Sequence, residues 1–124
     1  MDLDGFKQVN DLYGHKYGDF VLRVVAARLR SEVRIGDTVA RWAGDEFAVI
    51  VEETDEHYVN QLVQRLRQAI MDPIDVDGVI LSVSASIGTA YYPKEADSAA
   101  ALLELADQRM FDRKSGDKPE MPAT

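Results

Sequence analysis

A short turn between two β-rich stretches constrains the fold of this chain more than any other feature. Residues 37–42 and 46–52 are rich in β-branched and aromatic side chains, and Ala43-Gly44-Asp45 lies between them. A connection of this length with a central glycine predicts a β-hairpin. The hairpin would present the carboxylates of Asp45 and Glu46 together at its tip.

Three segments are expected to form helices. Residues 20–33 carry apolar side chains on most of a helix circumference, which predicts a helix buried under a sheet. Apolar residues recur at steps of three and four from residue 55 to Pro73, which predicts an amphipathic helix with Thr54 as its N-cap. The same spacing predicts a last helix over residues 98–113.

Apolar residues alternate with serines over residues 79–87, after an Asp77-Gly78 turn, and this alternation predicts one half-buried strand. The order strand, helices, hairpin, helix, strands, helix indicates an α+β fold, with a mainly antiparallel sheet flanked by helices. The large side chains expected in its core are Trp42, Phe47, Met110 and Phe111.

Composition excludes several classes of protein. The 124 residues contain no cysteine, which excludes disulfides and thiolate zinc sites and fits a cytoplasmic protein. The acidic start and the lack of a long apolar run predict a soluble domain without membrane contact. The net charge of −8 argues against a nucleic-acid partner, because a phosphate backbone favours a basic surface.

A second acidic cluster, Asp2 and Asp4, lies at the start of the chain. Carboxylates that meet across a sheet can hold a divalent metal over a nucleotide phosphate, as in polymerases and cyclases. Taken alone, Asp2 and Asp4 also fit a solvent-facing strand end, and residues 43–46 also fit an ordinary turn. A calcium loop is excluded because Lys7 occupies the position where that loop needs glycine.

Two segments together, DLDGFKQVNDLYGHKYGD and RWAGDEF, resemble the diguanylate cyclase (GGDEF) domain family, whose fold is like the palm of nucleotidyl cyclases. The resemblance implies a domain over residues 1–118 and a disordered tail over residues 119–124. In the family a helix and most of the first strand precede this point, so the chain is expected to begin at the end of that strand.

The resemblance implies the condensation of two GTP molecules to cyclic di-GMP and pyrophosphate by a homodimer that an upstream sensory or regulatory domain controls. Asp2, Asp45 and Glu46, with the Leu3 carbonyl, would bind Mg²⁺ or Mn²⁺, and Asp45 and Glu46 would be catalytic. A receiver domain also pairs acids at strand ends, but it needs a repeated βα pattern that this sequence lacks.

The resemblance also implies substrate contacts. Asn10 and Asp19 would read guanine, and an acidic acceptor there would reject adenine, which lacks the matching donors. The remaining substrate-binding positions would be Phe6, Lys7, Ala43, Gly44, Lys114 and Lys118. The two lysines, expected to bind phosphate, equally fit cations that complement the dipole at a helix C-terminus.

Several features depart from the family pattern. Ala43 replaces the first glycine of the signature, Phe111 replaces a tyrosine, and Lys118 replaces an arginine and so loses a bidentate fork. The expected loss of the preceding helix and strand is a further departure. These departures leave a second function open, in which a catalytically weakened module binds GTP or cyclic di-GMP and regulates a partner.

A further cluster concerns control. Arg34 and Asp37 lie at the family spacing of an inhibitory product site, and Arg65 matches a supplementary arginine of that site. Arginine forks suit guanine and phosphate alike. Without the resemblance, Arg34 and Asp37 would be read as a surface ion pair of small energetic value.

Overall fold

The structure is a computed structural model that describes residues 1–117. The chain divides into two compact units, Leu3–Ala85 and a second unit of Met1–Asp2 with the segment from Ser86 onward. Within the described residues the elements follow in the order β1 (Asp2–Asp4), α1 (Phe6–Tyr13), α2 (His15–Glu32), β2 (Thr38–Ala43), β3 (Glu46–Ile50), α3 (Glu56–Met71), β4 (Ile74–Val76), β5 (Val79–Leu81), β6 (Ser84–Ser86) and α4 (Ala99–Asp117).

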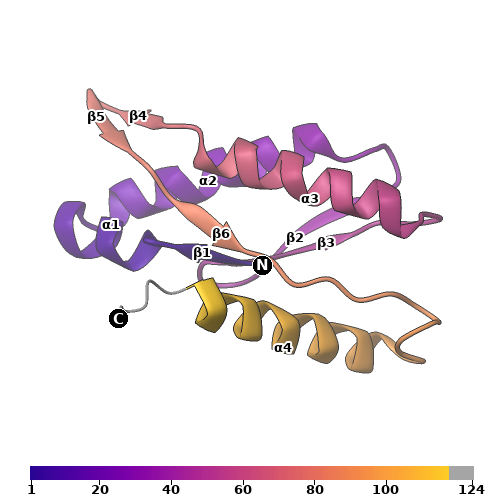
Figure 1. The fold of residues 1–124 in the computed structure, drawn as a ribbon. Coiled ribbons are helices and arrows are strands. Elements are labelled where there is room, and N and C mark those ends of the chain that lie inside the picture. The colour runs from indigo at the N-terminus through magenta and orange to yellow at the C-terminus, as the bar shows by residue number, and fades with distance from the viewer. Residues whose placement is uncertain (118–124) are drawn as a thin grey trace. The chain divides into compact units, whose positions relative to one another are not determined.

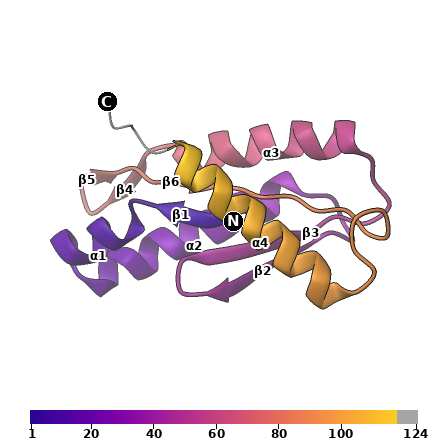
Figure 2. The ribbon, with the colours of Figure 1, turned by 60° about the horizontal axis from the view of Figure 1, so that its bottom comes forward.

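The larger unit is built on a four-stranded sheet with the strand order β2-β3-β1-β6. The predicted hairpin is confirmed: β2 pairs antiparallel with β3, and Figure 2 shows the two strands side by side. Ala43 still pairs with Glu46, so the turn is shorter than predicted and consists of Gly44 and Asp45. A register shift between Arg41 and Ala43 interrupts the ladder just before this turn. The α+β class is therefore confirmed.

Two helices follow β1 without a long loop. Gly5 caps α1 with a φ of +88°, and Gly14 connects α1 to α2 with a φ of +93°; both values favour glycine. The helix predicted over residues 20–33 therefore begins earlier, at His15. Its buried side chains, Val21, Leu22, Val25 and Leu29, form one inward face, and Phe20 is 40% exposed, so the buried surface is narrower than predicted.

Helix α3 lies beside α2 on one side of the sheet (Figure 1). Its N-cap is Asp55, whose carboxylate accepts the N–H of Tyr58 at 2.8 Å, and the predicted Thr54 cap is wrong. A carboxylate at this position satisfies a free amide and also complements the helix dipole. At the other end, the Arg28 guanidinium of α2 donates to the carbonyl oxygens of Ala69 at 3.0 Å and Asp72 at 2.6 Å.

The strand predicted over residues 79–87 is wrong as a single element. Strand β5 pairs with β4 in a separate two-stranded sheet, whereas β6 joins the four-stranded sheet. The Asp77-Gly78 turn between β4 and β5 is confirmed, with φ of +51° and +86° at these two residues. The predicted alternation holds over residues 81–85, where Leu81, Val83 and Ala85 are buried, but it fails at Ser86, which is 2% exposed.

The second unit contains α4 and the segment before it. Ser98 caps the helix, since its Oγ accepts the N–H of Ala101 at 3.1 Å, and the helix extends beyond the predicted end to Asp117. Gly88 lies against the α4 backbone, so that a Cβ there would be 2.9 Å from the Met110 Cα. Arg109 of α4 forms two charge-assisted bonds with Glu95, at 2.7 and 2.9 Å.

Two of the four expected core residues are buried. Phe47 is 2% and Met110 is 7% exposed. Trp42 and Phe111 are 62% and 65% exposed, so their assignment to the core was wrong. Trp42 lies on β2, which has a strand partner on one side only. Phe111 follows Met110 in a helix, where a step of one residue turns a side chain away from the face of its neighbour.

None of the helices in residues 1–117 is both long enough and apolar enough to cross a bilayer.

Candidate functional site

The first strand and the hairpin turn are joined by a backbone hydrogen bond. The Leu3 N–H donates to the Asp45 carbonyl at 3.1 Å, and the Leu3 side chain is buried. Asp45 and the following Glu46 are half-buried at this junction. The two acidic motifs were predicted to lie side by side, and Leu3 of the first motif is indeed bonded to Asp45 of the second, far along the chain.

The donor set at this junction suits a hard cation. Within the larger unit the candidate ligands are the carboxylates of Asp45 and Glu46 and the Leu3 carbonyl, and the predicted ligand Asp2 precedes Leu3 in the sequence; all are oxygen donors. Within residues 1–117 no group of three or more acidic or histidine side chains forms a ready-made metal cluster. Mg²⁺ does not need one, because it binds through one or two carboxylates, several waters and the substrate phosphates. The oxygen donors present therefore fit the ligand chemistry of Mg²⁺.

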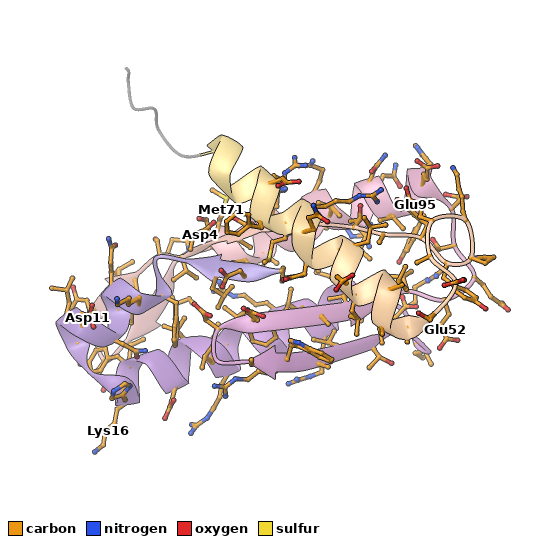
Figure 3. The ribbon with its side chains drawn as sticks, turned by 90° about the horizontal axis from the view of Figure 1, so that it is seen from below. Asp4, Asp11, Lys16, Glu52, Met71 and Glu95 are labelled. Carbon is orange, nitrogen blue, oxygen red and sulfur yellow. The ribbon has the colours of Figure 1, made fainter. Side chains whose placement is uncertain are left out.

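Asp4, the second acid of the first motif, is the last residue of β1 and contacts the neighbouring strand β6. The Ser84 hydroxyl of β6 donates to Asp4 Oδ2 at 3.5 Å, and Figure 3 labels Asp4 on β1. Asp11 and Lys16, which the same figure labels, are exposed on α1 and α2. Asp4 therefore links β1 to β6 and so helps to hold the strand that carries Leu3.

Asn10, one of the two predicted guanine-reading residues, packs against Gly18, the residue that precedes Asp19. Asn10 Oδ1 is buried against Gly18, and it has no hydrogen-bond partner within the described part of the chain. A Cβ on Gly18 would collide with that oxygen and would be 2.9 Å from Asn10 Cγ. Gly18 immediately precedes the exposed Asp19. The structure thus shows an exposed carboxylate at Asp19 and a buried, unsatisfied amide oxygen at Asn10.

Gly18 was not among the predicted site residues. The signal was present in the sequence, since a glycine inside a helical pattern costs about 1 kcal/mol relative to alanine and often marks close packing. What the glycine packs against becomes visible only when α1 and α2 are folded together.

The other predicted substrate residues differ in exposure. Phe6 is buried, and its Cζ lies 3.2 Å from the position of a Cβ on Gly18, so Phe6 packs against the same glycine as Asn10. Lys7 is exposed in the first turn of α1. Ala43 and Gly44 are exposed at the hairpin, where the Gly44 carbonyl accepts a bond from Arg41 Nε at 2.8 Å. Lys114 belongs to the last turn of α4, and Lys118 lies outside the described residues, as does the predicted tail.

The predicted product-site residues Arg34 and Asp37 are in direct contact. Asp37 Oδ2 lies 3.4 Å from Arg34 Nε and accepts the Arg34 backbone N–H at 3.1 Å, while Oδ1 accepts the Glu52 N–H at 3.2 Å. Burial raises the pKa of the Asp37 carboxyl, but the bonds from Glu52 and Arg34 outweigh it and hold the pKa below its ordinary value. Only 2% of the Asp37 side chain is exposed, against 45% for Arg34.

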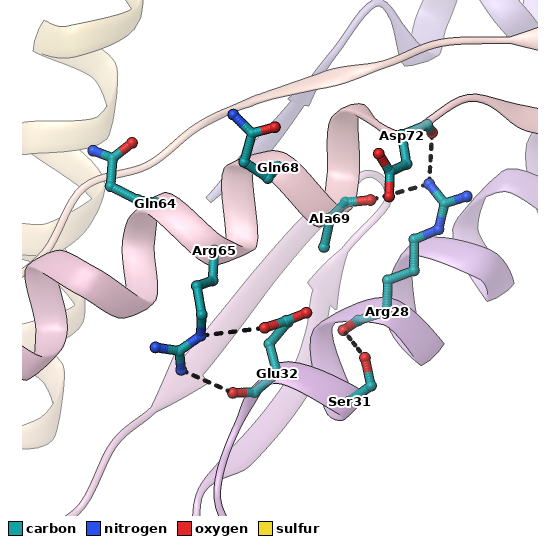
Figure 4. A pocket seen from close by; sticks show the side chains of 8 residues that line it. All are labelled: Arg28, Ser31, Glu32, Gln64, Arg65, Gln68, Ala69 and Asp72. Carbon is teal, nitrogen blue, oxygen red and sulfur yellow. Dashed lines mark hydrogen bonds and ion pairs between the residues drawn. The ribbon is translucent and has the colours of Figure 1, made fainter.

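The third predicted member, Arg65, borders an open groove between α2 and α3 (Figure 4). Its Nε lies 3.2 Å from Glu32 Oε1, and its Nη2 donates to the Glu32 carbonyl at 3.1 Å. The residues that line the groove are mostly polar: Arg28, Ser31, Glu32, Gln64, Arg65, Gln68, Ala69 and Asp72.

Comparison with known proteins agrees with the fold and the motifs. Residues 1–119 match the family described as "Diguanylate cyclase, GGDEF domain", and the chain belongs to this family. It is 41% identical over 113 residues to diguanylate cyclase TpbB of Pseudomonas aeruginosa, covering 90% of this chain and 26% of TpbB. The crystal structure of the TpbB GGDEF domain matches with a TM-score of 0.89 and 40% identity, covering 93% of this chain and 73% of that one.

Two further similarities bear on function. The chain is 42% identical over 115 residues to the cyclic di-GMP phosphodiesterase NbdA of P. aeruginosa, covering 93% of this chain but only 15% of NbdA. It is 27% identical to the GGDEF domain of DgcB from Caulobacter crescentus, solved in complex with c-di-GMP, with a TM-score of 0.83, covering 94% of this chain and 70% of that one. The chain thus spans a minor part of the curated relatives that it matches.

Proposed function

We propose that this chain is the catalytic domain of a diguanylate cyclase. Two copies would each bind one GTP. The 3′-hydroxyl oxygen of each GTP attacks the α-phosphorus of the other, its proton leaves, and the bond to pyrophosphate breaks, so that two GTP give cyclic di-GMP and two pyrophosphates. The observation that carries this proposal is the hydrogen bond from Leu3 to Asp45, which joins the two acidic motifs of a family named for this activity.

The residues at the junction have distinct proposed roles. Asp2, Asp45 and the Leu3 carbonyl would hold Mg²⁺ or Mn²⁺, and Glu46 would be a further ligand or accept the hydroxyl proton. When bound, the cation would lower the pKa of the attacking hydroxyl and neutralise phosphate charge. Gly44, which has no side chain and is exposed, would let the backbone come close to the phosphates. Lys114 and Lys118 would bind phosphate groups of the GTP.

Asn10 and Asp19 would select guanine over adenine. The Asp19 carboxylate can accept from the N1–H and the exocyclic amino group of guanine, and adenine has neither donor at these places. The Asn10 amide, whose Oδ1 is buried against Gly18 and has no partner among the described residues, would turn toward the base to offer an additional acceptor. A site built to pair with such donors discriminates strongly, because the wrong base leaves its polar groups without partners.

A separate site would bind the product and inhibit the enzyme. Arg34, Asp37 and Arg65 would contact guanine and phosphate groups of cyclic di-GMP. The complex of the DgcB domain with c-di-GMP supports this ligand. The exposed fractions of Arg34 and Arg65, 45% and 42%, leave both guanidinium groups accessible.

A second candidate function is a regulatory module that binds GTP or cyclic di-GMP with little turnover. The region that matches this chain occurs in NbdA, which is named a phosphodiesterase. Ala43 and Lys118 are the departures in this chain that would weaken catalysis.

Turnover separates the two candidates. The protein is incubated with GTP and Mg²⁺ or Mn²⁺, and cyclic di-GMP is measured by mass spectrometry. We expect metal-dependent product that Asp45→Asn abolishes at an unchanged melting temperature, because a neutral amide is a poor cation ligand. Asp97→Asn, the same change at an exposed position, is the control. Near-normal turnover by Asp45→Asn would refute the metal assignment, and GTP binding without product would favour the regulatory module.

A further inference from the structure

The ring of Tyr58 is close to both arginines of the proposed product site. The Arg34 Cζ is 4.3 Å and the Arg65 Cζ 5.8 Å from the centroid of the Tyr58 ring. Both distances are within the range in which an aromatic face attracts a guanidinium. The Tyr58 backbone is itself fixed, because its N–H is bonded to Asp55 at the start of α3.

Arg34 is held on the ring and still has donors to offer. Its Nε is paired with Asp37, and its Nη2 donates to the Glu52 carbonyl at 2.7 Å. Within the described residues its Nη1 has no hydrogen-bond partner, although the side chain is 45% exposed. The guanidinium is therefore oriented before any ligand arrives.

Arg65 contacts the same ring from within helix α3. It lies two helical turns after Tyr58 in α3, and its Nε and Nη2 are bound to Glu32 (Figure 4). Each guanidinium has its own carboxylate partner, Asp37 for Arg34 and Glu32 for Arg65. The face of the Tyr58 ring attracts both guanidinium groups. Removing the ring would remove a contact that the two arginine side chains share.

The Tyr58 hydroxyl makes no hydrogen bond to either arginine. Its oxygen is buried and has no hydrogen-bond partner among residues 1–117. The aromatic ring, and not the hydroxyl, is therefore the group that orders the arginines. Tyr58→Phe should leave the arrangement intact.

We propose that Tyr58 is a positioning and specificity residue for a guanine-containing cyclic dinucleotide: its ring holds Arg34 and Arg65 together so that both bind one ligand. This inference rests on the proposed product site. The inference adds that the two arginines depend on each other through Tyr58, whose side chain carries no charge and has no hydrogen-bond partner among residues 1–117. Arginines ordered in advance lose less side-chain entropy when the ligand binds.

Calorimetry of cyclic di-GMP binding to the full chain tests the proposal. We expect Tyr58→Phe to keep the parent affinity, and Tyr58→Leu and Tyr58→Met to weaken it by about 2- to 30-fold, the range of a cation–π contact. Arg34→Ala should weaken binding in the parent and less so in the Tyr58→Leu background. The control is Arg23→Ala, which removes an exposed arginine of α2 that is not part of the proposed product site.

Thermal melting of each variant separates positioning from folding. If Tyr58→Leu lowers the melting temperature, Tyr58→Met and the comparison with Tyr58→Phe still test the role of the ring. Parent-like affinity in folded Tyr58→Leu and Tyr58→Met, with binding still lost in Arg34→Ala, would overturn the role of Tyr58 and leave the product site standing. Parent-like affinity in Arg34→Ala would instead overturn the product site itself.

Discussion

Gly18→Ala should damage the guanine site through one methyl group. Alanine in a helix interior is favoured over glycine by about 1 kcal/mol. At Gly18, however, the new Cβ would collide with Asn10 Oδ1 and be 2.9 Å from its Cγ. Overpacking of this kind costs about 1–3 kcal/mol. We therefore expect Gly18→Ala to be neutral to about 2 kcal/mol less stable and to weaken GTP binding, because the Asn10 amide must move.

A double-mutant cycle with Asn10→Ala isolates this collision. In the Asn10→Ala background the clashing atoms are gone, and Phe6 Cζ at 3.2 Å is the closest remaining neighbour of the new Cβ. Gly18→Ala should then be neutral or stabilising, which gives a coupling of about 1–3 kcal/mol between the two positions. The free energy of unfolding of the four proteins is measured in urea, and GTP affinity by calorimetry. Additive changes, or a Gly18→Ala variant that binds GTP like the parent, would refute the reasoning.

Two further predictions concern single carboxylates. Asp19→Ser should erode the preference for GTP over ATP in calorimetry, and equal binding of both nucleotides by the parent would contradict the assignment of Asp19. Because the pKa of Asp37 is lowered in the folded protein, its ionised form stabilises the fold above its ordinary pKa of 3.8, and this stability is lost as the pH falls below 3.8 through the folded pKa. Asp37→Asn should therefore lower the melting temperature at pH 7, and the difference from the parent should shrink below pH 3.8; a difference independent of pH would contradict this.

Local patterns in the sequence predicted much of the fold. The hairpin and its acidic tip, the amphipathic helix that ends before Pro73, and the Asp77-Gly78 turn are all confirmed. Each depends on residues that are close in sequence, where periodicity and turn chemistry act directly. The hydrogen bond from Leu3 to Asp45 likewise agrees with the expectation that the two acidic motifs lie side by side.

Errors arose where competing local signals were equally plausible. Thr54 and Asp55 are both good N-caps, and only the observed bond to Tyr58 distinguishes them. Residues 79–87 alternate like one strand, yet their backbone pairs first with β4 and then within the larger sheet. Alternation reports which side chains are buried, and it does not report which strand supplies the hydrogen bonds.

The sequence by itself determined the family, the acidic motifs and the residue types available for guanine and phosphate. Tertiary structure alone decided that Gly18 receives the Asn10 amide and that one tyrosine ring meets two arginines. It also decided that Trp42 is exposed. The physical reason is that the Asn10–Gly18 contact and the Arg34–Tyr58 contact join different elements, which only packing brings together, and that the exposure of Trp42 depends on which elements cover its strand.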